Sequence, residues 1–316
     1  MRVSEVLQDN LRNEVSSFSF EYFVPKTAQL LQRVRIDANE YNVVQGVQNL
    51  YDRIDRMKDL HPLFADVTWN AGGTSRQGVA TTTEMIAKVN KAYGLPTCMH
   101  LTCTGMSREA IDQALLEAYN GGCRCILALR GDPPLENEKW EATVGGFLYA
   151  RDLVTYIREQ YNDYFEVGVA GYPEGHPEEH DHEVLIDHLK EKLDAGASFV
   201  ITQMFYDVDH FLDWVDKCRE KGITAPIVPG IMPISNYASF VRRAKWCEIN
   251  VPPEFMLALE RVKDDDAAVR EVGAELVSDM CKAIIEKGRI YHLHFYTMNL
   301  EKSTRVILER LGLLRN

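Results

Sequence analysis

The sequence predicts an α/β protein with a (β/α)8 barrel, or TIM barrel, fold, and three observations support that class. Apolar runs of β-strand character recur eight times, and longer amphipathic stretches separate them. Polar motifs close several of these runs, and parallel α/β folds keep their chemistry at the carboxyl ends of strands. The GxGxxG and GxxxxGK[ST] patterns of nucleotide-binding sheets are missing from the sequence. We therefore favour a barrel over a doubly wound sheet, and we expect a single domain over residues 1–316.

The chain begins with an expected helix and a first strand. Residues 1–14 mix acidic with apolar residues and lack the apolar core of a secretory signal, which predicts an amphipathic helix leading into the fold. SFSFEYF at 17–23 is the first strand. The connection that follows is long, and its insertion, residues 28–45, is either a lid or a lengthened helix. We favour the helix, because such insertions are well tolerated.

Seven further strands follow, each an apolar run bounded by turn residues or by the end of a helix. The segments between them carry apolar residues at helical spacing. Two clear examples, residues 107–122 and 183–197, begin with Ser or Glu and end near Gly. The eight predicted strands cover residues 17–23, 64–69, 96–103, 124–131, 165–172, 198–206, 225–233 and 289–299.

Composition excludes several classes of protein. The chain has 316 residues, a net charge of −12 and a pI near 5.3, so it lacks the basic surface that a general nucleic-acid binder needs. No apolar run is long enough to span a membrane. The seven cysteines are scattered and form no CxxC pair. We expect a cytoplasmic protein with reduced thiols, and any anionic ligand must be met by a few local Lys or Arg residues.

The ends of the predicted strands carry the candidate site residues. The most informative pair of motifs is HLTC, which begins at His100, and LRGDP, which contains Asp132. In a barrel these ends converge on one mouth. The strand-end candidates are Glu21, Thr68, Trp69, His100, Arg130, Gly131, Asp132, Tyr172, His176, Gln203 and Tyr296.

Two carboxylates are candidates for catalysis. Glu21 stands among aromatic residues in FSFEYF, and apolar surroundings disfavour its charged form, which suits a general acid near neutral pH. A carboxylate salt-bridged at the barrel rim explains Glu21 equally well. Asp132 follows Gly131, whose freedom allows a backbone to approach a ligand closely. Its ordinary alternative is an Asp that caps the turn before Pro133.

The histidines raise the possibility of a metal site. His292 and His294 alternate on the last strand and share a face, and His176, His180 and His182 lie in GHPEEHDHE. Zinc requires three or four converging ligands, and neither group has a matching carboxylate signature. We expect a hydrogen-bonded strand pair and a solvated loop, with no metal. A metal-dependent barrel hydrolase is the rival enzyme class.

These motifs together resemble the catalytic domain of methylenetetrahydrofolate reductase. They occur in that family's order and cover nearly the whole chain. The resemblance implies a (β/α)8 barrel that binds FAD, with a hydride passing from NADPH or NADH to 5,10-methylenetetrahydrofolate to give 5-methyltetrahydrofolate. The matching segments are FSFEYFVPKT, DVTWNAGG, HLTCTGMSREAI, ILALRGDPP, GYPEGHPE, HLKEKLDAGASFVITQMFYD, PIVPGIMPI and LHFYTMNLEKS.

The resemblance also implies roles for individual residues. Glu21 matches the general acid that protonates N10 of the folate, and Asp132 matches the carboxylate beside the pterin and flavin. Gln203 matches the amide that hydrogen-bonds the pterin, and we add Tyr296 as a substrate contact. Lys192 supplies positive charge for the FAD pyrophosphate. The positions that match FAD contacts are Thr68, Trp69, His100, Arg130, Gly131, Asp132, Tyr149, Ala150, Tyr172, His176 and Lys192.

The family's properties set further expectations for partners and regulation. NAD(P)H and the folate, including polyglutamylated forms, would use one flavin face in turn, which gives ping-pong kinetics, and self-association is common. If the chain is complete, S-adenosylmethionine should not inhibit it, because many eukaryotic members bind that molecule in a further domain. A folate- or flavin-binding protein without catalysis is the rival from outside enzymology.

Three features depart from the family pattern. The 28–45 insertion is longer than usual and lies beside Glu21 in sequence. Leu185 replaces an Asp that is often near the FAD, and Leu300 replaces an Arg that is often near the folate.

Overall fold

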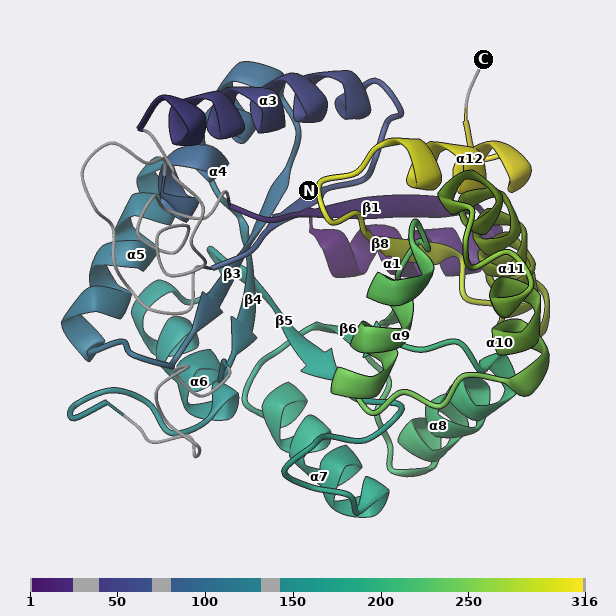
Figure 1. Ribbon diagram of the computed structural model, residues 1–316. Helices are drawn as coiled ribbons and strands as arrows, with labels where there is room; N and C mark the ends of the chain where they lie inside the picture. The colour runs from purple at the N-terminus through teal and green to yellow at the C-terminus, as the bar shows by residue number, and fades with distance from the viewer. Residues whose placement is uncertain (1, 25–39, 70–80, 132–142, 315–316) are drawn as a thin grey trace. The chain divides into compact units, whose positions relative to one another are not determined.

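The computed structural model describes residues 2–24, 40–69, 81–131 and 143–314, with side chains from residue 46 onward in the second range (Figure 1). Within these residues, eight strands form a closed barrel in the order β1 to β8, and the pairings of β2 with β3, β3 with β4, and β5 through β8 are parallel. The predicted barrel class is confirmed. The strands are β1 (Ser17–Tyr22), β2 (Ala65–Val67), β3 (Thr97–Thr102), β4 (Cys125–Leu129), β5 (Glu166–Gly171), β6 (Phe199–Met204), β7 (Ile227–Ile231) and β8 (His292–Tyr296).

The helices alternate with the strands for most of the chain. Every one of the eight strands falls inside its predicted run, and the expected N-terminal helix is present as α1. The helices are α1 (Val3–Asn13), α3 (Glu40–Lys58), α4 (Thr82–Tyr93), α5 (Arg108–Asn120), α6 (Ala150–Tyr161), α7 (His182–Asp194), α8 (Val208–Glu220), α9 (Tyr237–Trp246), α10 (Pro253–Glu260), α11 (Asp266–Gly288) and α12 (Lys302–Arg310).

The chain divides into two compact units. The terminal unit comprises Met1–Phe20 and Gly168–Asn316, and the central unit comprises Glu21–Val167. The single domain predicted from the sequence stays a prediction.

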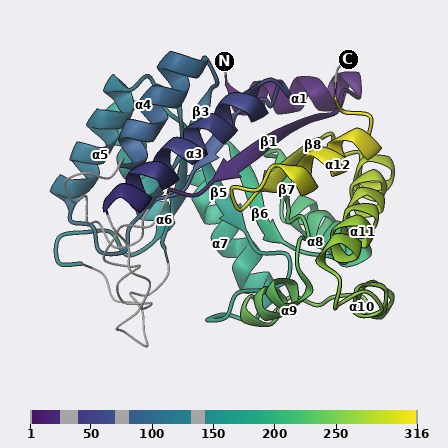
Figure 2. The same cartoon turned by 45° about the horizontal axis from the view of Figure 1, so that its top comes forward.

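The central unit packs helices along its strands. Helix α3 packs against α4, and α4 packs against α5 (Figure 2). Local sequence fixes the helix starts: the Thr81 hydroxyl accepts a hydrogen bond from the backbone N–H of Glu84, whose carboxylate accepts the N–H of Thr81 in return. The Ser107 hydroxyl caps α5 by accepting a hydrogen bond from the backbone N–H of Ala110. Fully buried side chains such as Ile54 and Phe64 form the core.

Aromatic side chains pack in the core of the terminal unit. The rings of Phe205 and Phe211 stack with centroids 4.1 Å apart. Gly168 in β5 leaves room for Phe199, because a Cβ at position 168 would lie 2.5 Å from that ring. Helix α11 packs against α8, α10 and α12.

Two features differ from a simple strand–helix alternation. After β7 the chain makes α9, α10 and α11 before it reaches β8. The two prolines at 252–253 start α10, because proline is favoured at the first helical turn, and Asp265 caps α11. Residues 40–45 of the predicted insertion belong to α3, while 28–39 lie outside the described residues.

Among the described helices, none combines the length and apolar character needed to cross a membrane.

Candidate active site

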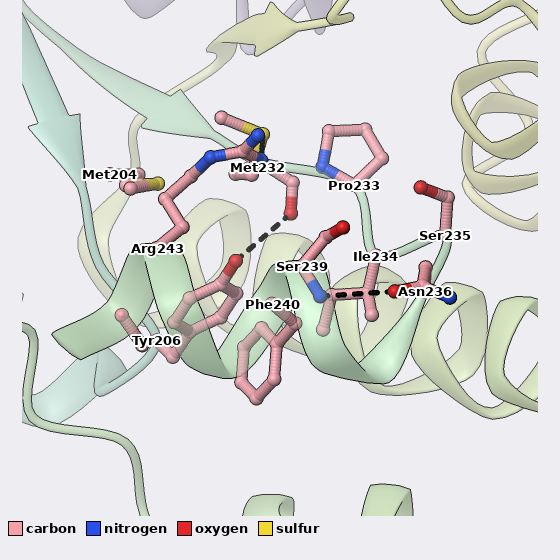
Figure 3. Close-up of a pocket in the computed structure, with 11 residues that line it drawn as sticks. Met204, Tyr206, Met232, Pro233, Ile234, Ser235, Asn236, Ser239, Phe240 and Arg243 are labelled. Carbon is pink, nitrogen blue, oxygen red and sulfur yellow. Dashed lines mark hydrogen bonds between the residues drawn. The ribbon is translucent and has the colours of Figure 1, made fainter. Parts of the chain in front are cut away.

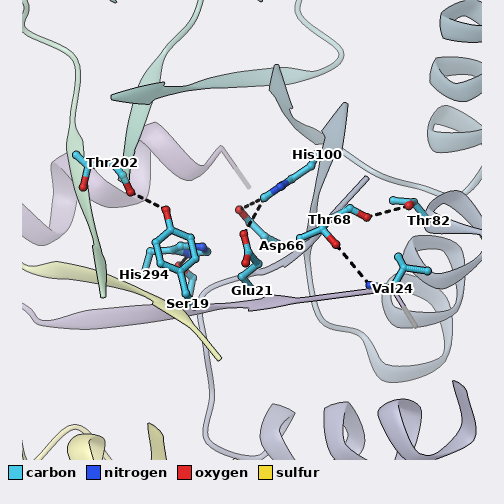
Figure 4. Close-up of polar contacts among 10 residues, drawn as sticks. Ser19, Glu21, Val24, Asp66, Thr68, Thr82, His100, Thr202 and His294 are labelled. Atoms are coloured by element: carbon cyan, nitrogen blue, oxygen red, sulfur yellow. Dashed lines mark hydrogen bonds and ion pairs between the residues drawn. The ribbon is translucent and has the colours of Figure 1, made fainter. Parts of the chain in front are cut away.

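Glu21, Asp66 and His100 form a buried polar cluster in the central unit. Glu21 lies near the end of β1, Asp66 in β2 and His100 in β3. The His100 Nε2 atom lies 3.0 Å from Asp66 Oδ2 and 3.7 Å from Glu21 Oε2 (Figure 4). Their exposed fractions are 5% for Glu21, 0% for Asp66 and 7% for His100. Water is therefore excluded from most of the cluster.

Burial makes the Glu21 carboxyl group a weaker acid than an exposed glutamate. Loss of hydration raises its pKa to about 7; the charge of His100 opposes that rise, and the charge of Asp66 adds to it. The pKa of His100 is also raised. Burial alone would lower that pKa, but the hydrogen bond and charge of Asp66, together with the charge of Glu21, outweigh it. The cluster can thus hold a proton on Glu21 at neutral pH, as the sequence predicted for a general acid.

The β2 end presents a firmly held backbone and an indole donor. Thr68 donates its N–H to the Tyr22 carbonyl at 3.0 Å, and its own carbonyl accepts the Thr82 hydroxyl at 2.9 Å. The Thr68 hydroxyl accepts the Val24 N–H at 3.4 Å. The buried Trp69 Nε1 has no hydrogen-bond acceptor within the described ranges of the chain. A buried donor of this kind is expected to meet a ligand or water.

The β3 and β4 ends form a cradle around Gly131. Gly131 has a φ of +88°, and a Cβ there would lie 2.7 Å from the Thr104 hydroxyl and 3.0 Å from Thr102 Cβ. The Thr104 hydroxyl donates to the Arg130 carbonyl at 3.0 Å. The buried Thr102 hydroxyl has no hydrogen-bond partner among the residues described. The LRGDP motif therefore needs glycine at position 131. The neighbouring candidate, Asp132, lies outside the described residues.

Tyr149 and Ala150 form the start of α6 in the same unit. The Tyr149 N–H donates to the Asp152 carboxylate at 3.1 Å, and Ala150 is the first helical residue. The Tyr149 side chain is 54% exposed, with the Arg151 guanidinium 6.0 Å from its ring centroid. This helix start therefore offers an exposed aromatic ring, while the Asp152 carboxylate takes the backbone N–H of Tyr149.

Tyr172, His176 and Lys192 lie together in the terminal unit. The rings of Tyr172 and His176 meet edge to face with centroids 4.9 Å apart. Lys192 projects from α7, donates to the Ala170 carbonyl at 2.7 Å, and lies 5.7 Å from the Tyr172 ring centroid. Burial lowers the pKa of Lys192 to about 8, so the ammonium group is close to neutralisation unless an anion binds.

The predicted folate contacts Gln203 and Tyr296 also lie in the terminal unit. Gln203 is the exposed residue in the otherwise buried strand β6. The Tyr296 hydroxyl donates to the Thr202 carbonyl at 2.6 Å. Gly230 in β7 makes this possible, because a Cβ there would lie 2.5 Å from the Tyr296 ring. Since the hydroxyl proton is engaged, Tyr296 can offer a ligand its ring or a lone pair.

The histidines that suggested a metal site have other partners. His292 contacts the Ser17 hydroxyl through Nδ1 at 2.6 Å and the Ser19 hydroxyl through Nε2 at 2.9 Å, and His294 Nδ1 lies 2.8 Å from Ser19. His182 packs edge to face on His210. Among the described residues, no group of three His, Cys, Asp or Glu side chains could hold a metal ion.

A small cavity in the terminal unit is too narrow for a cofactor. It lies between the end of β6, the loop after β7 and one face of α9, and Arg243 reaches across it to contact the Met232 sulfur at 3.3 Å (Figure 3). The cavity measures about 20 Å³, which is room for roughly one water molecule.

The two leucines that depart from the family pattern lie in the terminal unit. Leu300, which replaces an Arg of that pattern, is 46% exposed, and Leu185, which replaces an Asp, is half-buried.

Asp66 is the site residue that the sequence argument missed. The structure brings it against His100, and of these two residues only His100 was a candidate from the sequence. The signal was present, because FADVTW places an acid inside an apolar run just as FSFEYF does. A buried acid in a strand requires a partner, and the partner could not be identified without the register of β2 and β3.

Comparisons with known proteins give a family for this chain. The model of the family described as methylenetetrahydrofolate reductase matches residues 6–312. Methylenetetrahydrofolate reductase 2 of Saccharomyces cerevisiae is 49% identical over 318 residues, covering 99% of this chain and 50% of the yeast protein. Methylenetetrahydrofolate reductase (NADH) 1 of Arabidopsis thaliana is 42% identical over 323 residues, covering 99% and 51%. The chain thus spans about half the length of these relatives.

A solved structure supports the fold alone. It is an uncharacterised protein from Clostridium thermocellum, described as binding two copies of 5-methyl-5,6,7,8-tetrahydrofolic acid. It is 14% identical, with a TM-score of 0.57, and the match covers 96% of this chain and 97% of that one.

Proposed function

The chain belongs to the methylenetetrahydrofolate reductase family, and from that premise we propose that it reduces 5,10-methylenetetrahydrofolate to 5-methyltetrahydrofolate. NADH or NADPH is the hydride donor and FAD is the flavin. The overall reaction takes up one hydride and one proton, and it breaks the bond between the methylene carbon and N10 of the folate. A reductase of this kind therefore needs a group that can deliver a proton.

The observation that carries this proposal is the buried carboxyl group of Glu21. A surface glutamate is ionised at neutral pH, but Glu21 is 5% exposed and has a pKa of about 7. A large fraction of the molecules therefore carry the proton under physiological conditions. This is the condition that a general acid must meet, and we assign Glu21 the protonation of N10.

The residues present also fit a bound flavin nucleotide. In the central unit, the indole N–H of Trp69 and the hydroxyl of Thr102 are buried without partners in the described part of the chain, and the glycine at 131 lets the backbone pass close to Thr102 and Thr104. In the terminal unit, Lys192 supplies a cation for the pyrophosphate. When bound, FAD would carry the hydride between the two substrates.

We assign the folate to Gln203, Tyr296 and Asp132. Gln203 offers both a donor and an acceptor from an exposed position in β6, which matches the paired donors and acceptors of a pterin edge. Tyr296 is held rigidly by Thr202 and offers an aromatic surface. The two substrates bind in turn, so initial rates should follow ping-pong kinetics.

The test is reconstitution of the purified chain. The protein should be yellow as isolated or after addition of FAD, and it should convert methylenetetrahydrofolate to methyltetrahydrofolate with NADH or NADPH. Product identity by mass spectrometry separates a reductase from a flavin- or folate-binding protein. A colourless chain that neither takes up FAD nor forms the product would contradict the proposal.

A further inference from the structure

Asp66 is buried where an isolated carboxylate is costly. Its exposed fraction is 0%, and it lies in the three-residue strand β2. Strand register pairs Asp66 with Cys98, so His100 follows two residues later on the neighbouring strand. This offset brings the carboxylate within 3.0 Å of His100 Nε2. Buried carboxylates persist when they are paired and hydrogen-bonded, and His100 meets that requirement.

The same nitrogen of His100 faces two carboxylates at unequal distances. An imidazole Nε2 carries at most one hydrogen, and Asp66 lies closer than Glu21 by 0.7 Å, as the distances of 3.0 and 3.7 Å show (Figure 4). We therefore assign that hydrogen to Asp66. His100 then acts on Glu21 through its charge, because 3.7 Å exceeds a hydrogen-bond distance.

We propose that Asp66 is a positioning residue: its hydrogen bond fixes the His100 imidazole beside Glu21, and its negative charge helps to keep Glu21 in its acid form. The catalytic part of this inference rests on the proposed function, in which Glu21 is the general acid. The coupling between Asp66, His100 and Glu21 is a property of the folded chain, and it can be measured without substrate.

The sign of the effect follows from charge. His100 and Glu21 titrate as a coupled pair beside the negative charge of Asp66. Removing that charge makes every proton on the pair less tightly bound, so the apparent pKa values of the pair fall. Removing His100 deletes a positive charge next to Glu21, so the pKa of Glu21 rises. The two substitutions should therefore shift the pH profile in opposite directions.

The experiment compares Asp66→Asn, Asp66→Glu and His100→Gln with Asp112→Asn. Asp112 accepts a hydrogen bond from Tyr156 at 2.5 Å on the outer helices of the same unit, and so it is a matched control for the loss of a hydrogen-bonded carboxylate. The folate half-reaction is followed against pH. Asp66→Asn should bring its alkaline decline to lower pH, with about tenfold less activity relative to wild type at about pH 8 than at about pH 6. His100→Gln should move the decline to higher pH, while Asp66→Glu and Asp112→Asn should leave it in place.

Histidine-selective NMR provides a readout that needs no substrate. The His100 resonance, identified by its loss in His100→Gln, should titrate at lower pH in Asp66→Asn than in wild type. Unchanged titration, or shifts of the same sign in Asp66→Asn and His100→Gln, would overturn the inference. If Asp66→Asn does not fold, the upward shift in His100→Gln and the unchanged profile of Asp66→Glu remain as tests. A wild-type chain without reductase activity would refute the proposed function, but the NMR result would stand on its own.

Discussion

Glu21 differs from most of the acidic residues in this chain because its strand carries it into the interior. The protein has 47 acidic residues, and acidic side chains in folded proteins mostly face water. Glu21 instead lies in β1, where the burial pattern shows five consecutive buried residues. The cost of burying its charge appears as a higher pKa, and that change gives the carboxyl group its chemical use.

The first residue-scale prediction concerns Glu21→Gln. Glutamine keeps the size of the side chain but cannot supply a proton, so FAD binding and reduction by NAD(P)H should persist. The folate half-reaction should slow by about 10² to 10⁴-fold, the usual contribution of general acid catalysis. In wild type, that half-reaction should also decline as the pH rises above about 7, because Glu21 then loses its proton. Stopped-flow measurement of both half-reactions tests this, and equal losses in both would make Glu21 structural.

The second prediction concerns Lys192. Lys192→Met should weaken FAD binding, because α7 then offers no cation beside Tyr172. In wild type, affinity for FAD should fall as the pH rises above about 8, since the free lysine is then neutral, and this pH dependence should vanish in the variant. Lys190→Met is the matched control, because Lys190 lies in the same helix and pairs with Asp194. Fluorescence titration with FAD gives the affinities, and equal affinity in wild type and Lys192→Met would contradict the assignment.

The surroundings of a site residue could be predicted from the sequence where its immediate neighbours in the chain determine them. Glu21 stands among aromatic residues, which indicated apolar surroundings but left a salt bridge at the barrel rim equally open. Gly131 precedes a proline-rich turn, which indicated a close approach of the backbone. Asp66 needed knowledge of a neighbouring strand, and the hydrogen bond from Tyr296 to Thr202 joins residues 94 positions apart. Pairings of this kind depend on strand register, which periodicity does not give.

At the scale of elements, the strands could be predicted because each is an apolar run of the right length. β2 shows the limit, since its run of six residues forms a strand of only three. The segment between β7 and β8 shows another limit. Its helices α9 and α10 are short, and α10 begins at the second residue of the proline pair at 252–253.

The element-scale prediction concerns Gly230 in β7. Gly230→Ala should lower the free energy of unfolding by about 1–3 kcal/mol, because the new Cβ would lie 2.2 Å from the Thr202 carbonyl oxygen and 2.5 Å from the Tyr296 ring. It should also raise the KM for the folate by displacing Tyr296. Gly46→Ala, in α3, is the control: its Cβ would meet nothing within 4 Å, so it should be neutral or stabilising. Urea unfolding and steady-state kinetics test both; a Gly230→Ala protein as stable as wild type would refute this packing.

At the scale of the whole molecule, buried histidines link stability to pH. Burial, followed by the charge of His294, lowers the pKa of His292 to about 3. Unfolding restores the ordinary value, so between about pH 6.5 and about pH 3 the unfolded chain binds the extra proton. Stability should therefore fall with acidification by about 1.4 kcal/mol per pH unit from this residue.

The measurement is urea unfolding of wild type and His292→Gln at several pH values between about 6 and about 4. The wild-type free energy of unfolding should decline more steeply than that of the variant. His188→Gln, which replaces an exposed histidine of α7, should decline as wild type does. Parallel slopes for wild type and His292→Gln would show that His292 is not held neutral in the folded protein.

The most direct test of the account is an anaerobic two-step experiment on the chain loaded with FAD. NADH or NADPH is added first, and after removal of excess nicotinamide, methylenetetrahydrofolate is added. We expect the flavin absorbance to bleach in the first step and to return in the second, with one methyltetrahydrofolate formed per flavin. A flavin that bleaches with NAD(P)H but stays reduced in the presence of the folate would contradict the assignment of Glu21 and of the whole site.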